Sequence, residues 1–200
     1  MNEKFFDLKK EKQDRMINAA LKVFAENGFR RASTDEMVKE AGISKGLLFH
    51  YFTSKTGLYE FVYDYSVKYI MVELTSSVDT QETDYFALTR QVEKAKADAM
   101  KLFPYVQLFL YQTEKEDMPE ALEVMRESAE KLMNFYDEIY GHVVFDNLQG
   151  ISAEKLVKIV EYTKKGLLVE LLGASRFKAD MYYKEICDYL DELERLSVQK

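Results

Sequence analysis

The sequence is poor in the residues that form cross-links and metal sites. Of its 200 residues only Cys187 is a cysteine, and only His50 and His142 are histidines. A single thiol excludes a disulfide scaffold and a thiolate metal cluster, and it suits a reducing compartment. Two histidines 92 positions apart exclude a local histidine metal motif. We therefore expect no metal and no cofactor.

Turn residues and long apolar runs are also scarce. Eight glycines and two prolines leave few turns, which favours long helices. No uncharged apolar run reaches the roughly 18 residues of a membrane span, and residues 1–7 carry acids where a secretory signal would be apolar. A hydrophobic fraction of 47% is enough for a core. These features predict a soluble, cytoplasmic, all-α protein without membrane contact.

Charge is unevenly distributed along the chain. The net charge of −7 by itself argues against nucleic acid as a partner. Residues 1–55, however, hold 11 basic and 8 acidic side chains, a net of +3, whereas residues 56–200 hold 17 and 27, a net of −10. Such asymmetry suggests two modules with different partners, although three extra charges alone are also within ordinary fluctuation.

Apolar spacing and turn residues predict three helices in the first 55 residues. The first spans about 9–27 and ends at Gly28, and the second opens on a capping box of Ser33 and Glu36. The second helix ends at Gly42, and a third follows over 45–52, capped by Ser44. A helix, a glycine turn and a short helix form the helix-turn-helix pattern of DNA readers, which other helical corners also produce.

The remainder of the chain reads as six more helices, about nine in all. Ser54 can cap the fourth, over 55–75, and Pro104 and Pro119 lie at predicted helix starts. The last five are expected at about 84–103, 104–116, 119–142, 152–173 and 178–197.

The outer face of the third helix suits contact with DNA. If Leu48 and Phe52 point inward, Gly46, Leu47 and His50 point outward, where glycine permits close approach and leucine can touch a thymine methyl. Lys45 can reach a guanine edge or a phosphate, and free N–H groups at the helix starts near Ser33 and Ser44 favour phosphate oxygens. Tyr51 and Lys55 flank this face. Each residue also has an ordinary interpretation, as a cap or a solvated side chain, so the prediction depends on their convergence.

Residues 28–55 resemble the signature of TetR-family transcriptional regulators. The matching elements are Ala41-Gly42-Ile43-Ser44, Gly46, the aromatic cluster Phe49-His50-Tyr51-Phe52, and Ser54-Lys55. The resemblance covers roughly the first 60 residues; the rest matches only in length and helical character. The sequence departs from the family pattern at Phe49, where a tyrosine is usual. Phenylalanine has no hydroxyl group, so it cannot form the hydrogen bond to phosphate that a tyrosine could form there. The sequence also departs at Gly57, which weakens the first turn of the fourth helix.

The resemblance implies a helix-turn-helix DNA-binding domain over 1–55 and a larger helical ligand-binding and dimerisation domain over 56–200. It places DNA contacts at Ser33, Thr34, Ser44, Lys45, Gly46, Leu47, Phe49, His50, Tyr51 and Lys55.

The C-terminal part is rich in aromatic residues, which in this family suggests an apolar ligand pocket. The candidate lining residues are Met100, Phe103, Tyr105, Phe109, Met133 and Tyr140. Aromatic residues at helical spacing are also typical of an ordinary core, and that alternative stays open.

The last two helices are candidates for the dimer interface that the resemblance implies. Their apolar stripes contain Leu156, Val160, Leu167 and Leu171 in one helix and Tyr182, Ile186, Tyr189 and Leu193 in the other. The first of these helices is apolar around much of its girth, so it can pack inward and against a partner.

These patterns favour a homodimeric regulator that binds a pseudo-palindromic DNA operator and is a repressor released by a small apolar or aromatic ligand. A transcriptional activator of the same fold and a helical adaptor that binds only proteins are the alternatives. An enzyme would need converging catalytic groups, and none appear in the sequence.

Overall fold

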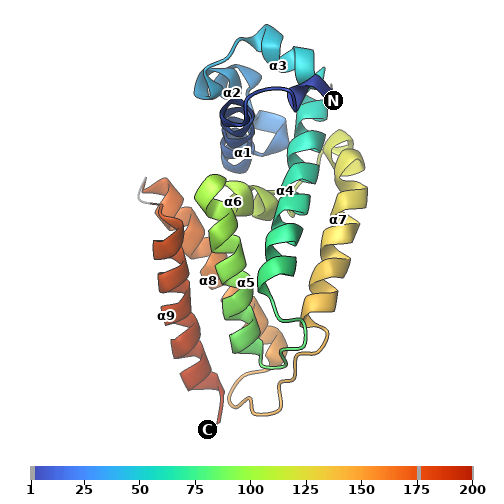
Figure 1. Ribbon diagram of the computed structural model, residues 1–200. Coiled ribbons are helices and arrows are strands. Elements are labelled where there is room, and N and C mark those ends of the chain that lie inside the picture. The colour runs from blue at the N-terminus through green and yellow to red at the C-terminus, as the bar shows by residue number, and fades with distance from the viewer. Residues whose placement is uncertain (1–2, 175–176, 200) are drawn as a thin grey trace. The chain divides into compact units, whose positions relative to one another are not determined.

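The computed structural model describes residues 3–174 and 177–199, which contain nine α-helices, one 3₁₀-helix and no β-strand (Figure 1). The all-α prediction and the predicted number of helices are confirmed. The elements are η1 (Glu3–Phe5), α1 (Lys10–Arg31), α2 (Thr34–Ala41), α3 (Lys45–Phe52), α4 (Lys55–Ser77), α5 (Tyr85–Leu102), α6 (Val106–Thr113), α7 (Pro119–Tyr140), α8 (Ala153–Gly173) and α9 (Ala179–Ser197).

The chain folds into two compact units. The first contains Met1–Tyr69 and Leu102–Leu132, and the second contains Ile70–Lys101 and Met133–Lys200. The first unit therefore extends beyond the predicted 1–55 segment, because α6 packs against α1. The division of roles at residue 55 stays a prediction.

Aromatic rings form the core of the first unit. Phe24 of α1 meets Tyr59 of α4 with ring centroids 4.8 Å apart, and Phe109 of α6 lies 5.6 Å from Tyr59. All three side chains are buried. Edge-to-face contacts of this kind add stability beyond the buried area, and they hold α1 in place as the support for α2.

The first helix is broken by a kink at its predicted end, Gly28, whose φ/ψ is non-helical. Gly28 has φ +68°, a conformation that side chains rarely adopt, so the predicted glycine stop is correct in its backbone geometry. One further turn follows through Arg31, and the Ala32 N–H donates to the Gly28 carbonyl. This turn carries the chain to α2.

Antiparallel packing of α8 and α9 contributes to the core of the second unit. The buried stripe of α9 contains Tyr182, Ile186 and Leu190. Two backbone hydrogen bonds hold the loop over 141–150. The Val144 N–H donates to the Thr83 carbonyl, and the Gln149 N–H donates to the Ser197 carbonyl.

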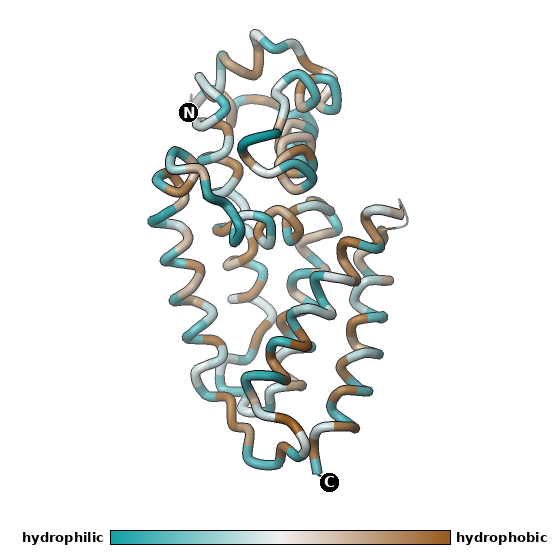
Figure 2. The backbone as a smooth tube through the Cα atoms, turned by 180° about the vertical axis from the view of Figure 1, so that it is seen from behind, coloured by the Kyte–Doolittle hydropathy of each residue, from teal (hydrophilic) through white to brown (hydrophobic). Residues whose placement is uncertain are grey.

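Polar and apolar residues alternate along the helices, as the interleaved teal and brown of the tube in Figure 2 show. None of the helices in the described part of the chain is both long enough and apolar enough to cross a membrane.

Candidate nucleic-acid interface

The segment from α2 to α3 is a helix-turn-helix. Gly42 ends α2 in the left-handed conformation, with φ 65° and ψ 42°, and Ile43 N–H donates to the Val38 carbonyl. Met37 and Ala41 of α2 are buried. The turn is thus closed by backbone hydrogen bonds, and α2 is anchored by its apolar side.

The outer surface of this motif matches the prediction from helical spacing. Leu48 and Phe52 of α3 are buried, whereas Gly46 and His50 are exposed and Leu47 is half-buried. Of the other predicted contact residues, Ser33, Ser44 and Lys45 are exposed, and Thr34 and Phe49 are half-buried. The structure therefore brings eight of the ten predicted residues to an accessible surface of α2 and α3.

The two predicted serine caps behave differently. Ser44 Oγ accepts a hydrogen bond of 3.2 Å from Leu47 N–H, as predicted for an N-cap. Ser33 occupies the N-cap position of α2 but makes no side-chain cap, so the predicted capping box with Glu36 is wrong. Because no Ser33 hydroxyl covers them, the first N–H groups of α2 are left for another acceptor, and a phosphate is a suitable one.

Lys45 forms an ion pair on this surface. Its Nζ lies 2.9 Å from Asp35 Oδ1, and both side chains are at least half exposed. Exposed pairs of this kind add little stability. A DNA phosphate would compete with Asp35 for the same ammonium group.

Replacing Asp35 by asparagine is therefore expected to strengthen binding to any DNA duplex about twofold to fivefold at low salt, because it frees Lys45 and removes a negative charge from the interface. Fluorescence anisotropy with specific and random duplexes measures the change. Glu11→Gln removes an exposed acid from α1 and is the control. Equal affinities of the Asp35→Asn variant and the native protein would show that Asp35 does not oppose binding.

Tyr51 does not belong to the exposed face. Its side chain is buried, and its ring lies 5.7 Å from the ring of Phe5 in η1. Phe5 is fully buried and also contacts Phe52 and Phe61, each at 5.1 Å. The prediction that Tyr51 clamps the DNA backbone is corrected by this packing: its ring joins α3 to the segment before α1, which lies beside α3 in Figure 1.

Lys55 also has a role within the protein. Its Nζ donates to the carbonyl oxygens of Phe29 at 2.8 Å, Arg30 at 3.3 Å and Ala32 at 3.3 Å, and it lies 4.6 Å from the centroid of the Phe29 ring. A cation at a helix C-terminus satisfies the last carbonyl groups and interacts favourably with the helix dipole. The predicted phosphate contact of Lys55 is therefore replaced by a structural role, in which Lys55 connects α4 to the end of α1.

Replacing Lys55 by methionine is expected to lower the free energy of unfolding by about 2 kcal/mol, because charged hydrogen bonds to three carbonyl groups are lost. Chemical denaturation measures the change, and Lys115→Met at an exposed position is the control. If the Lys55→Met variant kept native stability but bound DNA less tightly, Lys55 would contact phosphate, as the sequence predicted, and the structural role would be wrong.

Gly57, in the first turn of α4, allows a close approach of backbone. A Cβ at this position would lie 2.4 Å from the carbonyl oxygen of Phe52, the last residue of α3. The intervening turn contains Thr53 at φ 64°, and Ser54 Oγ accepts from Gly57 N–H at 3.0 Å, as predicted for a cap. The sequence suggests that Gly57 weakens α4; the structure shows that the missing side chain leaves room for the C-terminal end of α3.

The six predicted pocket residues are divided between the two units, with Phe103, Tyr105 and Phe109 in the first and Met100, Met133 and Tyr140 in the second. Phe103 and Phe109 are buried in the core of the first unit, where Phe103 packs on Tyr65 and Tyr69 and Phe109 packs on Tyr59. In the second unit Met100 is fully buried and Met133 is 59% exposed. The alternative interpretation, an ordinary aromatic core, therefore holds for Phe103 and Phe109. Tyr105 and Tyr140 are half-buried.

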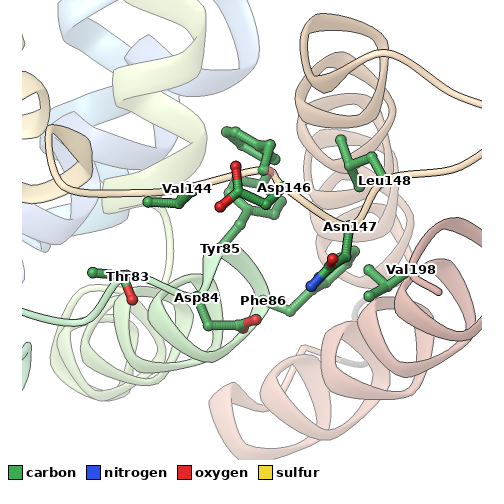
Figure 3. Close-up of a pocket in the computed structure, with 10 residues that line it drawn as sticks. Thr83, Asp84, Tyr85, Phe86, Val144, Asp146, Asn147, Leu148 and Val198 are labelled. Carbon is green, nitrogen blue, oxygen red and sulfur yellow. The ribbon is translucent and has the colours of Figure 1, made fainter. Parts of the chain in front are cut away.

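The second unit contains a small cavity of 190 Å³, lined by residues 83–86, 144–148 and Val198 (Figure 3). None of the six predicted residues lines it. Its volume is below the roughly 300 Å³ of a typical small-molecule site, and the carboxylates of Asp84 and Asp146 stand at its wall. It does not resemble the apolar pocket that the sequence predicts.

Six of the eight predicted dimer residues are internal to the chain. Leu156, Val160, Leu167, Leu171, Tyr182 and Ile186 are all buried in the second unit, so they present little surface to a partner. Tyr189 is exposed and Leu193 is half-buried. The sequence shows two apolar sides on α8, and most of the predicted residues lie on the side that packs within the chain; the dimer interface itself stays a prediction.

Three features of the structure were not predicted from the sequence. The burial of Phe5 is the first, and the only sequence signal for it is the apolar pair Phe5-Phe6 among charged residues. Gly57 gave no signal of close contact. Glu93, Lys96 and Lys164 are buried. The only signal in the sequence was that these charged residues interrupt otherwise apolar helix faces.

Comparison with known proteins supports the helix-turn-helix assignment. Residues 16–62 match the model of a family described as bacterial regulatory proteins, tetR family. The chain is 47% identical over 49 residues to the uncharacterised regulator YuxN of Bacillus subtilis, and 48% identical over 44 residues to the regulator UidR of Escherichia coli K12. These matches cover 24% and 22% of this chain, and only 17% and 22% of the relatives' own lengths.

The whole chain is similar in fold to a TetR-family regulator from Chloroflexus aurantiacus. The structures align with a TM-score of 0.61 at 21% identity, covering 100% of this chain and 99% of the other. The fold and the α2–α3 surface thus define a helix-turn-helix protein with a helical C-terminal region. The resemblance predicted from the sequence is confirmed over residues 16–62, which match the tetR-family model.

Proposed function

We propose that the protein is a sequence-specific DNA-binding transcriptional regulator that acts as a homodimer, and that it is a repressor released by a small molecule. The observation that carries the proposal is the accessible face of α3, where Gly46, Leu47 and His50 stand together on a helix-turn-helix. An exposed glycine beside an accessible leucine is unusual on a solvated helix but suits a helix that enters the major groove.

Phosphate contacts would come from the edges of this face. Lys45 lies at the start of α3, and the uncapped N–H groups at the start of α2 follow Ser33. Helix N-termini attract phosphate through free N–H groups and the helix dipole. The net charge of +3 over residues 1–55 acts in the same direction. Phosphate contacts position the motif, and the outer residues of α3 read bases.

A different surface from the predicted one supports dimerisation. On α8 the exposed apolar residues Ile159, Tyr162 and Val169 follow helical spacing with Gly166 between them, and on α9 Tyr189 and Leu196 are exposed. An apolar stripe of this kind on a helix whose other side is already buried is typical of a protein–protein interface. In a two-fold dimer the two recognition helices would contact the two halves of a pseudo-palindrome.

Release by a ligand follows from population shift. A small molecule that binds the second unit and prefers a dimer with wrongly spaced recognition helices lowers the affinity for the operator by the difference in its own affinity for the two states.

The test uses the DNA upstream of the protein's own gene as the candidate operator. The native protein is expected to bind it more tightly than random duplex, with affinity that falls steeply as salt rises. Leu47→Ala is expected to cost about 1–3 kcal/mol at one or two base positions and to leave binding to random DNA nearly unchanged.

Equal losses on specific and random DNA would contradict a base-reading role for Leu47. Absence of any binding at low salt would contradict the proposed function and favour an adaptor that binds only proteins. Tyr162→Glu on the outer face of α8 tests the dimer separately, since it is expected to give monomers in sedimentation experiments.

A further inference from the structure

The last turn of α1 follows the break in that helix. Gly28 has φ 68° and ψ 173°, so the peptide group after it departs from the helical direction. Phe29 is buried, and a buried N–H group that leaves the helical ladder needs an acceptor elsewhere. The Phe29 N–H donates to Glu116 Oε2 at 3.1 Å. The break thus offers a backbone donor to a side chain far along the sequence.

The carboxylate of Glu116 serves two parts of the first unit. Oε2 accepts from the Phe29 N–H, while Oε1 accepts from the Met118 N–H at 3.1 Å and the Asp117 N–H at 3.2 Å. Asp117 and Met118 directly precede α7, which begins at Pro119. Hydrogen bonds to a carboxylate are stronger than those between neutral groups. A single half-buried side chain therefore joins the break in α1 to the start of α7.

The carbonyl groups of the same turn, residues 29–32, are held by a cation. Lys55 Nζ donates to the carbonyl oxygens of Phe29, Arg30 and Ala32. A carboxylate at the N–H end and an ammonium group at the carbonyl end match the partial charges of a helical turn. All of these groups belong to the first unit. The 29–32 turn is therefore held between two side chains of opposite charge.

The 29–32 turn leads directly into α2. Ser33 is the N-cap and α2 begins at Thr34, so only Ser33 lies between the turn and the helix. The Phe29 ring lies 5.0 Å from the Tyr59 ring, which fixes where the turn lies. The hydrogen bond to Glu116 fixes how its first peptide group is rotated, because such bonds are directional. A rotation at this point would be passed to the first N–H groups of α2.

We propose that Glu116 is a positioning residue for DNA recognition: its carboxylate orients the 29–32 turn, and through it the start of α2, for contact with phosphate. Glu116 acts through the backbone and does not itself touch DNA. This inference rests on the proposed function, because it assigns a role in the binding that α2 and α3 carry out. The charge of Glu116 acts against that role, since a carboxylate repels DNA phosphates.

Paired alanine variants separate positioning from charge. Glu116→Ala and Asp117→Ala each remove one negative charge, at adjacent positions, and the Asp117 side chain is exposed. Removing an acid is by itself expected to leave DNA binding unchanged or to strengthen it. Glu116→Ala is instead expected to weaken binding to the candidate operator about threefold to tenfold, and Asp117→Ala is not. Fluorescence anisotropy at one salt concentration measures both variants.

Hydrogen exchange reports on the hydrogen bond itself. The Phe29 amide is expected to exchange at least about tenfold faster in Glu116→Ala than in the native protein, and at the native rate in Asp117→Ala. Leu21 and Phe24 are buried in α1 before the break. Their amides are expected to keep native rates in both variants, which distinguishes a local effect on the turn from a general loss of stability. Exchange followed by NMR measures the rates residue by residue.

Glu116→Gln is the conservative variant. Glutamine keeps one side-chain acceptor oxygen, so this variant is expected to weaken operator binding and to speed Phe29 exchange by less than Glu116→Ala does. Chemical denaturation identifies the samples that are folded. If Glu116→Ala does not fold, Glu116→Gln decides in its place, with Asp117→Asn as the matched control and the same two measurements.

Native operator affinity in the folded Glu116 variant, or a gain equal to that of its Asp117 control, would overturn the proposal. Faster exchange of Leu21 and Phe24 together with Phe29 would show a general structural role and would overturn it as well. A native protein that binds no DNA would refute the proposed function. A native protein that binds its operator no better than Glu116→Ala does would refute only the positioning role.

Discussion

Replacing Phe5 by alanine is expected to lower the free energy of unfolding of the first unit by about 3 kcal/mol, the range found when a buried phenylalanine is truncated in a packed core. Phe5 is fully buried although it lies five residues before α1. Its ring contacts Tyr51 and Phe52 of α3 and Phe61 of α4. Its removal leaves a cavity directly behind the recognition helix.

The same substitution at Phe6 provides the control. Phe6 is 53% exposed and contacts Phe5 from outside, so Phe6→Ala is expected to change stability much less. We also expect Phe5→Ala to reduce the preference for operator over random DNA, because α3 loses part of its support, and Phe5→Leu to restore much of it. Chemical denaturation and DNA titration measure the two effects. Similar losses at both positions would mean that the N-terminal segment acts only through general hydrophobicity.

Replacing Gly57 by alanine is expected to destabilise the first unit by about 2 kcal/mol or more, although alanine is usually the better residue in a helix. The added Cβ would lie 2.4 Å from the Phe52 carbonyl oxygen, which is a backbone atom at the end of α3. Relief of this clash would require α3 and α4 to move apart. Thermal unfolding measures the loss.

Gly46→Ala makes the same chemical change in open space. No atom lies within 4 Å of a Cβ at Gly46, so this variant is expected to be as stable as the native protein or up to about 1 kcal/mol more stable. It is nonetheless expected to bind DNA less tightly if α3 approaches the groove closely. A Gly57→Ala variant with native stability would show that the α3–α4 turn adjusts without cost.

The helix-turn-helix was predictable from the sequence because its determinants are local. Gly42 ends α2 by its own backbone freedom, and Ser44 caps α3 through an N–H three residues away. Leu48 and Phe52 of α3, one turn apart, were expected to share the inward side, and both are buried. Interactions within four residues thus account for this motif.

Other predictions failed because they depended on partners far along the chain. Lys55 contacts carbonyl groups of residues 29, 30 and 32, which no local pattern pairs with it. Helix α8 presents two apolar sides, and periodicity cannot tell which of them a neighbour covers. The choice is made by packing within the second unit, which buries Leu156 and Val160 and leaves Ile159 and Tyr162 outside.

By itself, the sequence determined that this protein is helical, where most of its helices begin and end, and which face of the recognition helix is accessible. Only the tertiary structure decided that Phe5 supports that helix and that Glu93, Lys96 and Lys164 meet in one buried cluster. The physical reason is range: helix formation and capping depend on residues one turn apart, whereas burial and ion pairing depend on side chains that folding brings together from distant positions.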